Sequence, residues 1–320
     1  MIENNKSKTP SFSKEVKEEI VSNQYTQERI RTLLSGFFKV NGAYHISGQN
    51  SYLSIETENA KVAKFIYQNI INIFHFNPKL SYSKTSRLGK KTIYRIIIES
   101  QADELLENLD IDFFEGKISK TLTYNDDVIG GYLAGAFLAG GSVSSPFSSN
   151  YHLEIALNHD NHAKWLAKLI NNKTASNFTA KIIKRRNKYV VYLKRSDHIS
   201  DFLVLIGASN CCLRFENIRL DRDFTNVNNR LVNCDSANYK KSVKASEEQI
   251  KAINKIIAHY GSVAYFDNEK LIHLVNLRLE YPEASLNELK DKLSDKLNIQ
   301  VSKSNINHMF RKIIQIASEI

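Results

Sequence analysis

The fold of this chain is decided by the stretch Tyr132-Leu-Ala-Gly-Ala-Phe-Leu-Ala-Gly-Gly141. Its apolar and small residues continue at helical spacing up to the glycine pair, which predicts a helix that ends there. The stretch Leu34-Ser-Gly-Phe-Phe-Lys-Val-Asn-Gly42 has the same Leu-x-Gly-x5-Gly pattern 99 residues earlier. Because small residues allow close backbone approach, we expect these two helices to pack against each other.

The elements that surround the two helices also recur in one order, helix-strand-strand-helix-strand-strand-helix. In the first copy, the second pair of strands is expected to turn at Arg87-Leu-Gly-Lys90. In the second copy, a hairpin is expected to join Ala180–Arg185 to Tyr189–Lys194. A repeat this long indicates paired half-domains rather than a solenoid. The sequence therefore predicts an α+β fold built by duplication, with half-domains at about 23–110 and 127–210.

Composition and periodicity divide the chain further. Phe12, Val16 and Ile20 recur every four residues, which predicts a short leading helix, and Ser246-Glu-Glu-Gln249 is a capping-box sequence that predicts a helix start. The predicted parts are a flexible polar arm at 1–10, the duplicated domain with its leading helix at 11–232, a polar linker at 233–245 and an all-helical domain at 246–320.

The end of the helical domain has the pattern of a helix-turn-helix. Ser285-Leu-Asn-Glu288 is a second capping box, and Ser302 begins the last helix after a turn of about four residues. Polar residues lie off the apolar stripe of that helix, at the end that enters the major groove in this motif. The candidate DNA-binding residues are Ser302, Lys303, Ser304, Asn305, Asn307, His308, Arg311 and Lys312. The alternative is an ordinary amphipathic helix with a solvated polar face.

The charge of the chain favours an anionic partner, because 44 Lys and Arg residues face 34 Asp and Glu residues, a formal net charge of +10. Residues 164–195 contain ten of the basic residues and no Asp or Glu. Strands there can present basic and aromatic groups to a phosphate backbone, and Tyr82, Lys84 and Arg95 offer a similar surface in the first half-domain. The second candidate DNA-binding surface contains Lys181, Lys184, Arg185, Arg186, Lys188, Tyr192 and Lys194. Solvated basic strands are the alternative.

Several classes of function lack their characteristic residues. The three cysteines, Cys211, Cys212 and Cys234, form neither a disulfide framework nor a zinc spacing, and no phosphate-binding glycine loop is present. The N-terminus has no signal-peptide core, and the run Ile129–Gly141 is too short and too rich in glycine to span a bilayer. We therefore predict a cytoplasmic, nucleoid-associated protein with no catalytic residues, no metal, no cofactor and no membrane contact.

The repeated helix pattern within the repeated element order resembles the LAGLIDADG fold. The resemblance implies half-domains that pack through these helices and saddle-shaped antiparallel sheets that lie over DNA. That family places an acidic metal ligand just before the last glycine of each helix. Here the two positions hold Asn41 and Gly140, and neither binds Mg²⁺ as a carboxylate does. A metal-dependent homing endonuclease is therefore the interpretation that we rank lowest.

Longer stretches are similar to the WhiA family over about residues 11–318. The similarity implies a bacterial transcription regulator that binds double-stranded DNA through a degenerate LAGLIDADG domain and a helix-turn-helix. It also implies a link to sporulation in mycelial bacteria and to cell division or chromosome segregation elsewhere. The alternative is a scaffold whose ancestral saddle binds a transcription or cell-division protein. The similar stretches are Ser11–Ile20, Tyr132–Pro146, Tyr151–Ile155, Asp201–Ala208, Asn229–Cys234, Leu277–Leu286 and Ser302–His308.

Overall fold

The computed structural model describes residues 10–48, 50–85, 91–113, 115, 124–173, 176–266 and 268–320. The chain divides into two compact units, residues 1–222 and residues 223–320. The arm expected at 1–10, apart from Pro10, and the turn expected at 87–90 lie outside the described residues.

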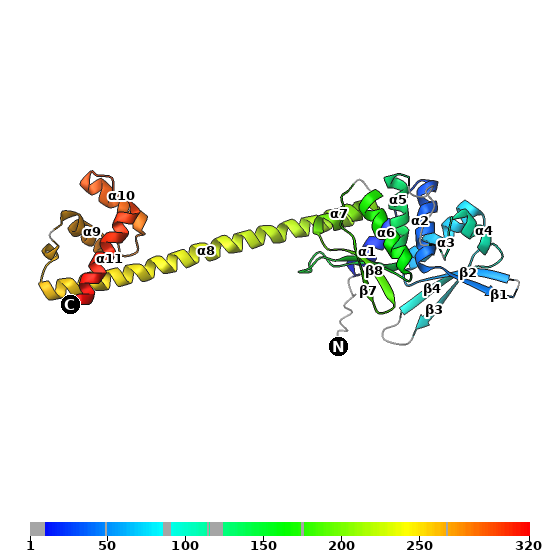
Figure 1. Ribbon diagram of the computed structural model, residues 1–320, viewed down its shortest axis with the longest axis horizontal. Helices are drawn as coiled ribbons and strands as arrows, with labels where there is room; N and C mark the ends of the chain where they lie inside the picture. The colour runs from blue at the N-terminus through cyan, green and yellow to red at the C-terminus, as the bar shows by residue number, and fades with distance from the viewer. Residues whose placement is uncertain are drawn as a thin grey trace, which may run out of the picture. The chain divides into compact units, whose positions relative to one another are not determined.

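The first unit confirms the predicted α+β fold and its duplication (Figure 1). The first half-domain contains α2 (Gln27–Asn41), β1 (Ala43–Ser47), β2 (Asn50–Thr57), α3 (Ala60–Phe74), β3 (Lys79–Thr85), β4 (Lys91–Ile98) and α4 (Ala102–Asn108). The second contains α5 (Asp126–Gly140), β5 (Gly141–Val143), β6 (Leu153–Leu157), α6 (Asp160–Lys173), β7 (Lys181–Arg185), β8 (Lys188–Leu193) and α7 (Ser196–Leu205). Both sheets are antiparallel and have equivalent strand orders, β1-β2-β4-β3 and β5-β6-β8-β7.

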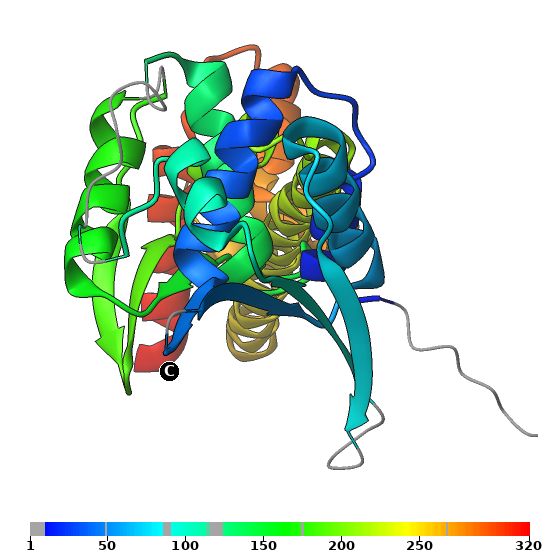
Figure 2. The same cartoon turned by 90° about the vertical axis from the view of Figure 1, so that its right-hand side faces the viewer.

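Each sheet packs one face against the helices. In the first sheet, Leu53 pairs with Ile98 and Ile55 pairs with Ile96, and all four side chains are buried. The opposite faces carry polar residues because side chains alternate along a strand. In Figure 2 the sheets lie beneath the helices, and the β3–β4 hairpin in cyan and the β7–β8 hairpin in light green extend downward at opposite sides. The two sheets thus form the saddle expected of the fold.

The crossing of α2 and α5 depends on two glycines. A Cβ atom on Gly135 would lie 1.9 Å from the main-chain oxygen of Leu33, and one on Gly36 would lie 2.1 Å from that of Tyr132. No side chain fits at such distances, so the two helix backbones are in direct contact. The expectation from the repeated pattern is therefore confirmed.

A leading helix, α1 (Phe12–Ile20), packs on this core. It buries Phe12, Val16 and Ile20, as their spacing predicts. The Ser13 hydroxyl donates to the Val143 carbonyl oxygen and accepts from the Val143 amide, both at 2.8 Å. These bonds fix α1 against β5, beside the C-terminal end of α5.

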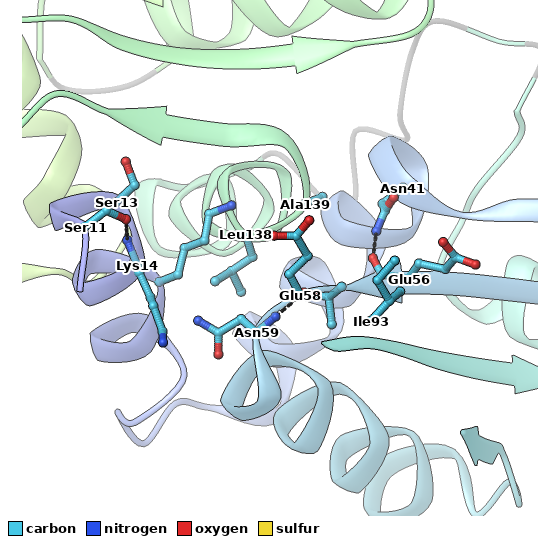
Figure 3. Close-up of a pocket in the computed structure, with 12 residues that line it drawn as sticks. Ser11, Ser13, Lys14, Asn41, Glu56, Glu58, Asn59, Ile93, Leu138 and Ala139 are labelled. Atoms are coloured by element: carbon cyan, nitrogen blue, oxygen red, sulfur yellow. Dashed lines mark hydrogen bonds between the residues drawn. The ribbon is translucent and has the colours of Figure 1, made fainter. Parts of the chain in front are cut away.

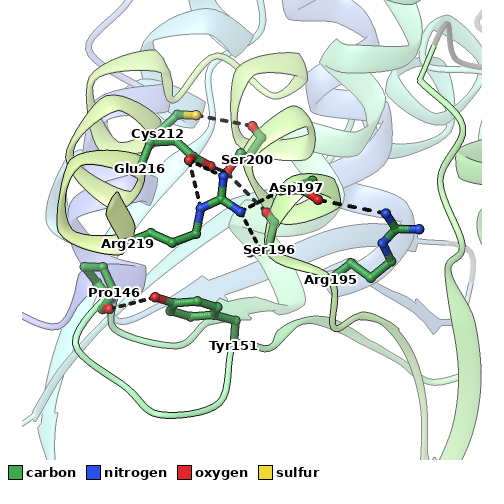
Figure 4. Close-up of polar contacts among 9 residues, drawn as sticks. All are labelled: Pro146, Tyr151, Arg195, Ser196, Asp197, Ser200, Cys212, Glu216 and Arg219. Carbon is green, nitrogen blue, oxygen red and sulfur yellow. Dashed lines mark hydrogen bonds and ion pairs between the residues drawn. The ribbon is translucent and has the colours of Figure 1, made fainter. Parts of the chain in front are cut away.

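The long helix α8 (Ser209–Tyr260) begins in the first unit, in a polar network with α7 (Figure 4). The Arg219 guanidinium donates to Asp197 at 2.6 Å and to Glu216 at 2.9 Å. One turn further, Arg222 lies over the ring of Tyr151, 4.7 Å from its centroid. The first part of α8 is thereby held against the first unit.

The segment predicted as a linker at 233–245 is helical, because α8 continues through it without interruption. Its composition is polar, but residues 209–260 contain neither glycine nor proline to end a helix. Ser246 does not begin a helix either; its side chain is buried and its hydroxyl donates to the Pro282 carbonyl oxygen. The helix ends where predicted, at Gly261, which has a φ of +76°.

The second unit is helical throughout, as predicted. After the end of α8 it contains a short 3-10 turn η2 (Val263–Tyr265), α9 (Glu269–Glu280), α10 (Leu286–Leu297) and α11 (Lys303–Glu319). Its core includes Ile253, Leu274, Leu289 and Phe310 from the four helices in turn. None of the described helices combines the length and the apolar character needed to cross a bilayer.

Candidate nucleic-acid interface

Two hydrogen-bonded caps define the helix-turn-helix. At the start of α10, the Glu288 amide donates to the Ser285 hydroxyl at 3.2 Å, and the Ser285 amide donates to the Glu288 carboxylate at 2.6 Å. The predicted capping box is thus confirmed. Because the Glu288 carboxylate accepts the hydrogen bond from the Ser285 amide, the pKa of Glu288 is lowered. At the start of α11, the Ser302 hydroxyl accepts from the Asn305 amide at 3.2 Å.

The turn between α10 and α11 is closed by a left-handed residue and a serine. Asn298 has a φ of +50° and ends α10. The Ser294 hydroxyl donates to the Lys290 carbonyl oxygen at 2.7 Å and accepts from the Val301 amide at 3.2 Å. These contacts fix the direction in which α11 leaves the turn.

The two faces of α11 separate as the periodicity predicts. Ile306, Phe310, Ile313 and Ala317 are buried in the core of the second unit. The eight predicted DNA-binding residues are all exposed, and the first four follow one another at the N-terminal end of the helix: Ser302, Lys303, Ser304, Asn305, Asn307, His308, Arg311 and Lys312. The eight residues therefore lie on the solvent-exposed side of α11 and at its N-cap, spread over more than half of the helix circumference.

Arg278 is a residue of this domain that the sequence reasoning missed. Its side chain is 1% exposed, donates to the Ala284 carbonyl oxygen at 2.7 Å and lies over the Phe310 ring at 5.3 Å. Burial lowers the pKa of Arg278 to about 10. Through these contacts Arg278 connects three parts of the domain: α9, the loop that precedes α10, and α11. Its spacing from Leu271 and Leu274 places it on the inward face of α9, which is the signal that could have identified it.

The second predicted surface, on the β7–β8 hairpin, is only partly brought together. The register pairs Lys181 with Tyr192 and Arg185 with Lys188, so these four residues share the face turned away from the helices. Lys184 pairs with Tyr189 on the opposite face, where its ammonium lies 5.5 Å from the Tyr189 ring centroid. The prediction of one surface is therefore wrong for Lys184. The two-residue turn causes this, because it puts odd positions of β7 beside even positions of β8.

Two other members of this set lie at the ends of the strands. Arg186 occupies the turn with a φ of +52°. Lys194 follows β8, and its ammonium lies 5.4 Å from the ring of Tyr192. The first hairpin departs from prediction in the same way: Tyr82 pairs with Tyr94, whereas Arg95 pairs with Ser81 on the other face.

The basic stretch 164–195 is partly compensated in space, although it contains no acidic residue. Arg185 donates to the Glu154 carboxylate of β6 at 2.9 Å, and the Lys164 ammonium lies 2.5 Å from Asp160. In the first sheet, Arg95 similarly donates to Glu56 at 2.7 Å. Carboxylates of neighbouring elements thus reduce the positive field that the sequence alone suggested.

The positions of the family's metal ligands do not fit a divalent ion. The Asn41 amide nitrogen donates to the Glu56 carbonyl oxygen at 2.5 Å. A Cβ atom on Gly140 would lie 2.5 Å from the carbonyl oxygen of Ala156, so no side chain fits there. Position 41 therefore has a neutral amide that already makes a hydrogen bond (Figure 3), and position 140 has no room for a side chain that could bind a metal.

Comparisons with known proteins agree along the whole chain. Three family models match it in succession: the WhiA N-terminal LAGLIDADG-like domain at residues 27–112, the WhiA LAGLIDADG-like domain at 129–225 and the WhiA C-terminal HTH domain at 228–317. The "Probable cell division protein WhiA" of Lactobacillus acidophilus is 40% identical over 314 residues, covering 97% of this chain and 99% of the relative. That of Enterococcus faecalis is 36% identical over 313 residues, covering 97% and 98%.

A solved structure shows the same fold. Full-length DUF199/WhiA from Thermatoga maritima is 24% identical, covers 97% of this chain and 99% of its own, and superposes with a TM-score of 0.59. The duplicated LAGLIDADG-like domain, the helix-turn-helix and the identity with curated relatives lead to one conclusion: this chain belongs to the WhiA family.

Proposed function

We propose that this chain is a transcription regulator that binds double-stranded DNA in the nucleoid and acts in cell division or chromosome segregation. The observation that carries the proposal is the polar surface of α11, with eight exposed residues at the position of a recognition helix. In such a helix, asparagine and arginine side chains hydrogen-bond to base edges, and lysine side chains contact phosphates. The curated relatives carry the name "Probable cell division protein WhiA", which supports the cellular role.

The test is binding of the full chain to promoter and random-sequence duplexes across a salt series. Arg311→Ala should weaken binding to a preferred promoter about tenfold and weaken random duplexes less, because it removes a base or phosphate contact. Lys270→Ala is the matched control, since it removes one exposed charge at the start of α9, outside the helix-turn-helix. Equal promoter affinity in the wild type and Arg311→Ala would count against α11 as the reading helix.

We propose in addition that the chain does not cut DNA. The support is twofold: the neutral Asn41 amide donates to the Glu56 carbonyl oxygen, and no space exists for a side chain at Gly140. Supercoiled plasmid incubated with the purified chain and Mg²⁺ should remain supercoiled. Mg²⁺-dependent nicking activity that copurifies with the chain would contradict this part of the proposal.

A protein-binding scaffold is the second candidate, and one observation favours it. Phe224, Val227 and Leu231 form a stripe on α8 and are 69%, 52% and 58% exposed. Weak, salt-insensitive DNA binding, together with tight binding of a purified transcription or cell-division protein that Phe224→Ser abolishes, would favour the scaffold. Steep salt dependence with promoter selectivity favours the regulator.

A further inference from the structure

The middle of α8 is exposed on every side. All residues of 223–240 are exposed, although α8 runs through this stretch as one helix (Figure 1). Five of these residues are asparagine, which is a poor helix former. A single helix of such a composition is only marginally stable in water, because most helical stability in proteins comes from packing of an apolar face. A packing partner would therefore stabilise this stretch.

The apolar residues of this stretch have the spacing of a coiled coil. They form a seam of four exposed side chains, separated by four, three and four positions, which we call the α8 seam: Leu220, Phe224, Val227 and Leu231. This spacing places successive apolar side chains along the line where two helices wrap around each other. Because all four are exposed, the second helix does not come from the described part of the same chain.

The α8 seam fits a reversed copy of itself. When two copies of α8 run antiparallel and Phe224 of one lies opposite Val227 of the other, Leu220 also lies opposite Leu231, because both pairs are centred on the same point of the helix. Every layer of the seam then contains only apolar side chains. Each phenyl ring meets a smaller valine, and this alternation of large and small side chains fills the space between two helices.

The charges beside the α8 seam favour the same antiparallel register. Asp223 precedes Phe224 and Arg230 precedes Leu231, so both charges lie on the same flank of the seam. In the antiparallel pair, Asp223 of each copy lies beside Arg230 of the other. Both side chains are exposed, and neither makes an ion pair within the described residues. Both are therefore available to a second copy.

A parallel pair of the same helices is less complementary. It places the two Phe224 rings in one layer and puts Glu216 beside Asp221, which carries the same charge. Its favourable contact is Arg230 with Asp235. The sizes and the charges of the side chains thus both favour the antiparallel arrangement.

We propose that α8 pairs with α8 of a second copy of this chain, in antiparallel orientation, and that the α8 seam holds the resulting homodimer together. The pairing covers the seam of both copies and adds an Asp223–Arg230 ion pair on each side. It also covers the stripe that favours a scaffold, so binding of a different protein there is an outcome of the tests. Where the proposed DNA binding also holds, the twofold dimer reads an inverted repeat; the pairing itself does not rest on that function.

Sedimentation equilibrium of the full chain, without DNA, measures the pairing. The wild type should change from monomer to dimer as its concentration rises. Phe224→Ser should raise the dissociation constant of the dimer about tenfold, because each dimer loses two phenyl rings from its seam. Val232→Ser is the matched control, since Val232 is also an exposed apolar residue of α8 but lies outside the seam. Neither side chain is buried in the chain, so both variants should keep the fold of the wild type.

Reversal of the flanking charges tests the register. Asp223→Arg or Arg230→Asp alone places like charges across the interface and should weaken the dimer about fivefold. The two changes together restore opposite charges and should restore the wild-type dissociation constant. In a parallel pair the double variant would stay weak, because Arg230→Asp would put a second carboxylate beside Asp235.

A disulfide reports the direction of the helices. In the antiparallel register, the free thiol of Cys234 lies opposite Asn217 of the second copy, at the end of the α8 seam. Asn217→Cys should therefore form a covalent dimer under mild oxidation. The wild type should not, because its two Cys234 thiols lie at opposite ends of the seam. Asn229→Cys is the matched control, since this exposed position is on the face of α8 opposite the seam.

Each outcome decides the proposal. A chain that stays monomeric at every concentration overturns the dimer, and so does a dimer that Phe224→Ser leaves intact. Oxidised wild type linked through Cys234 overturns the antiparallel arrangement. A monomeric chain that binds a purified transcription or cell-division protein through Phe224 supports the scaffold and overturns the homodimer. Since DNA is absent from these measurements, a Phe224-dependent dimer without promoter binding leaves the homodimer standing and overturns the regulator.

Discussion

The Tyr132 hydroxyl and the Nε2 atom of His162 lie 2.8 Å apart inside the core of the first unit. Burial lowers the pKa of His162 to about 3, with smaller contributions from the charges of Lys39 and His159. The imidazole is therefore neutral in the folded chain at every pH at which the protein functions. Between pH 6.5 and about 3, the unfolded chain binds a proton at this position that the folded chain does not.

This difference predicts acid sensitivity. Stability should fall as the pH falls through that window, by up to about 1.4 kcal/mol for each pH unit from this group. His162→Gln keeps a polar partner for Tyr132 but does not titrate, so its free energy of unfolding should depend less steeply on pH. Urea unfolding of both chains from pH 7 to pH 4 measures the two slopes. Parallel slopes would show that His162 titrates alike in both states.

Gly135→Ala should destabilise the first unit by about 3 kcal/mol, because its Cβ would overlap the Leu33 carbonyl oxygen. In an open helix the same change would be favourable by about 1 kcal/mol. Gly48→Ala is the control. A Cβ atom there would have no neighbour within 4 Å, so only the left-handed backbone, with a φ of +64°, should lower the free energy of unfolding, by about 1 kcal/mol. Denaturant unfolding compares the two, and equal losses would mean that α2 and α5 can separate at little cost.

Arg278→Lys should destabilise the second unit by about 2 kcal/mol, because an ammonium cannot both reach the loop carbonyls and stack on Phe310. Hydrogen exchange of α10 and α11 should increase. Arg311→Lys, at an exposed position of α11, should leave exchange unchanged. Identical protection in the two variants would remove Arg278 from the groups that hold the helix-turn-helix together.

The three free cysteines should differ in reactivity. Cys234 is exposed, whereas burial raises the pKa of Cys211 to about 12 and also raises that of Cys212. A maleimide at neutral pH should therefore label one thiol in the folded chain and three in urea. Cys234→Ser should abolish the fast reaction. Rapid labelling of a second thiol in the folded wild type would contradict the packing around α8.

Local sequence patterns predicted those features that depend on neighbours close in the chain. The capping box at Ser285, the start of α11 at Ser302 and its buried stripe all follow from short-range spacing. The close crossing of α2 and α5 was predictable because Gly36 and Gly135 repeat within equal element orders. The same kind of capping-box sequence at Ser246 predicted a helix start that is not present, because α8 already runs through that position.

Features set by contacts distant in sequence were not predictable in the same way. Strand register decided that Lys184 and Arg95 lie on faces other than those expected, and a turn of different length would have reversed the outcome. Glu154 and Glu56 offset basic residues that looked uncompensated along the chain.

The packing at Gly140 limits which substitutions the chain can accept there. A carboxylate takes a single codon change, yet its first side-chain atom would lie 2.5 Å from the Ala156 carbonyl oxygen. β6 would have to move first, and that shift would disturb the β5-β6-β8-β7 sheet. A carboxylate at position 140 is therefore blocked by the placement of a neighbouring backbone, which a substitution at that position alone does not undo.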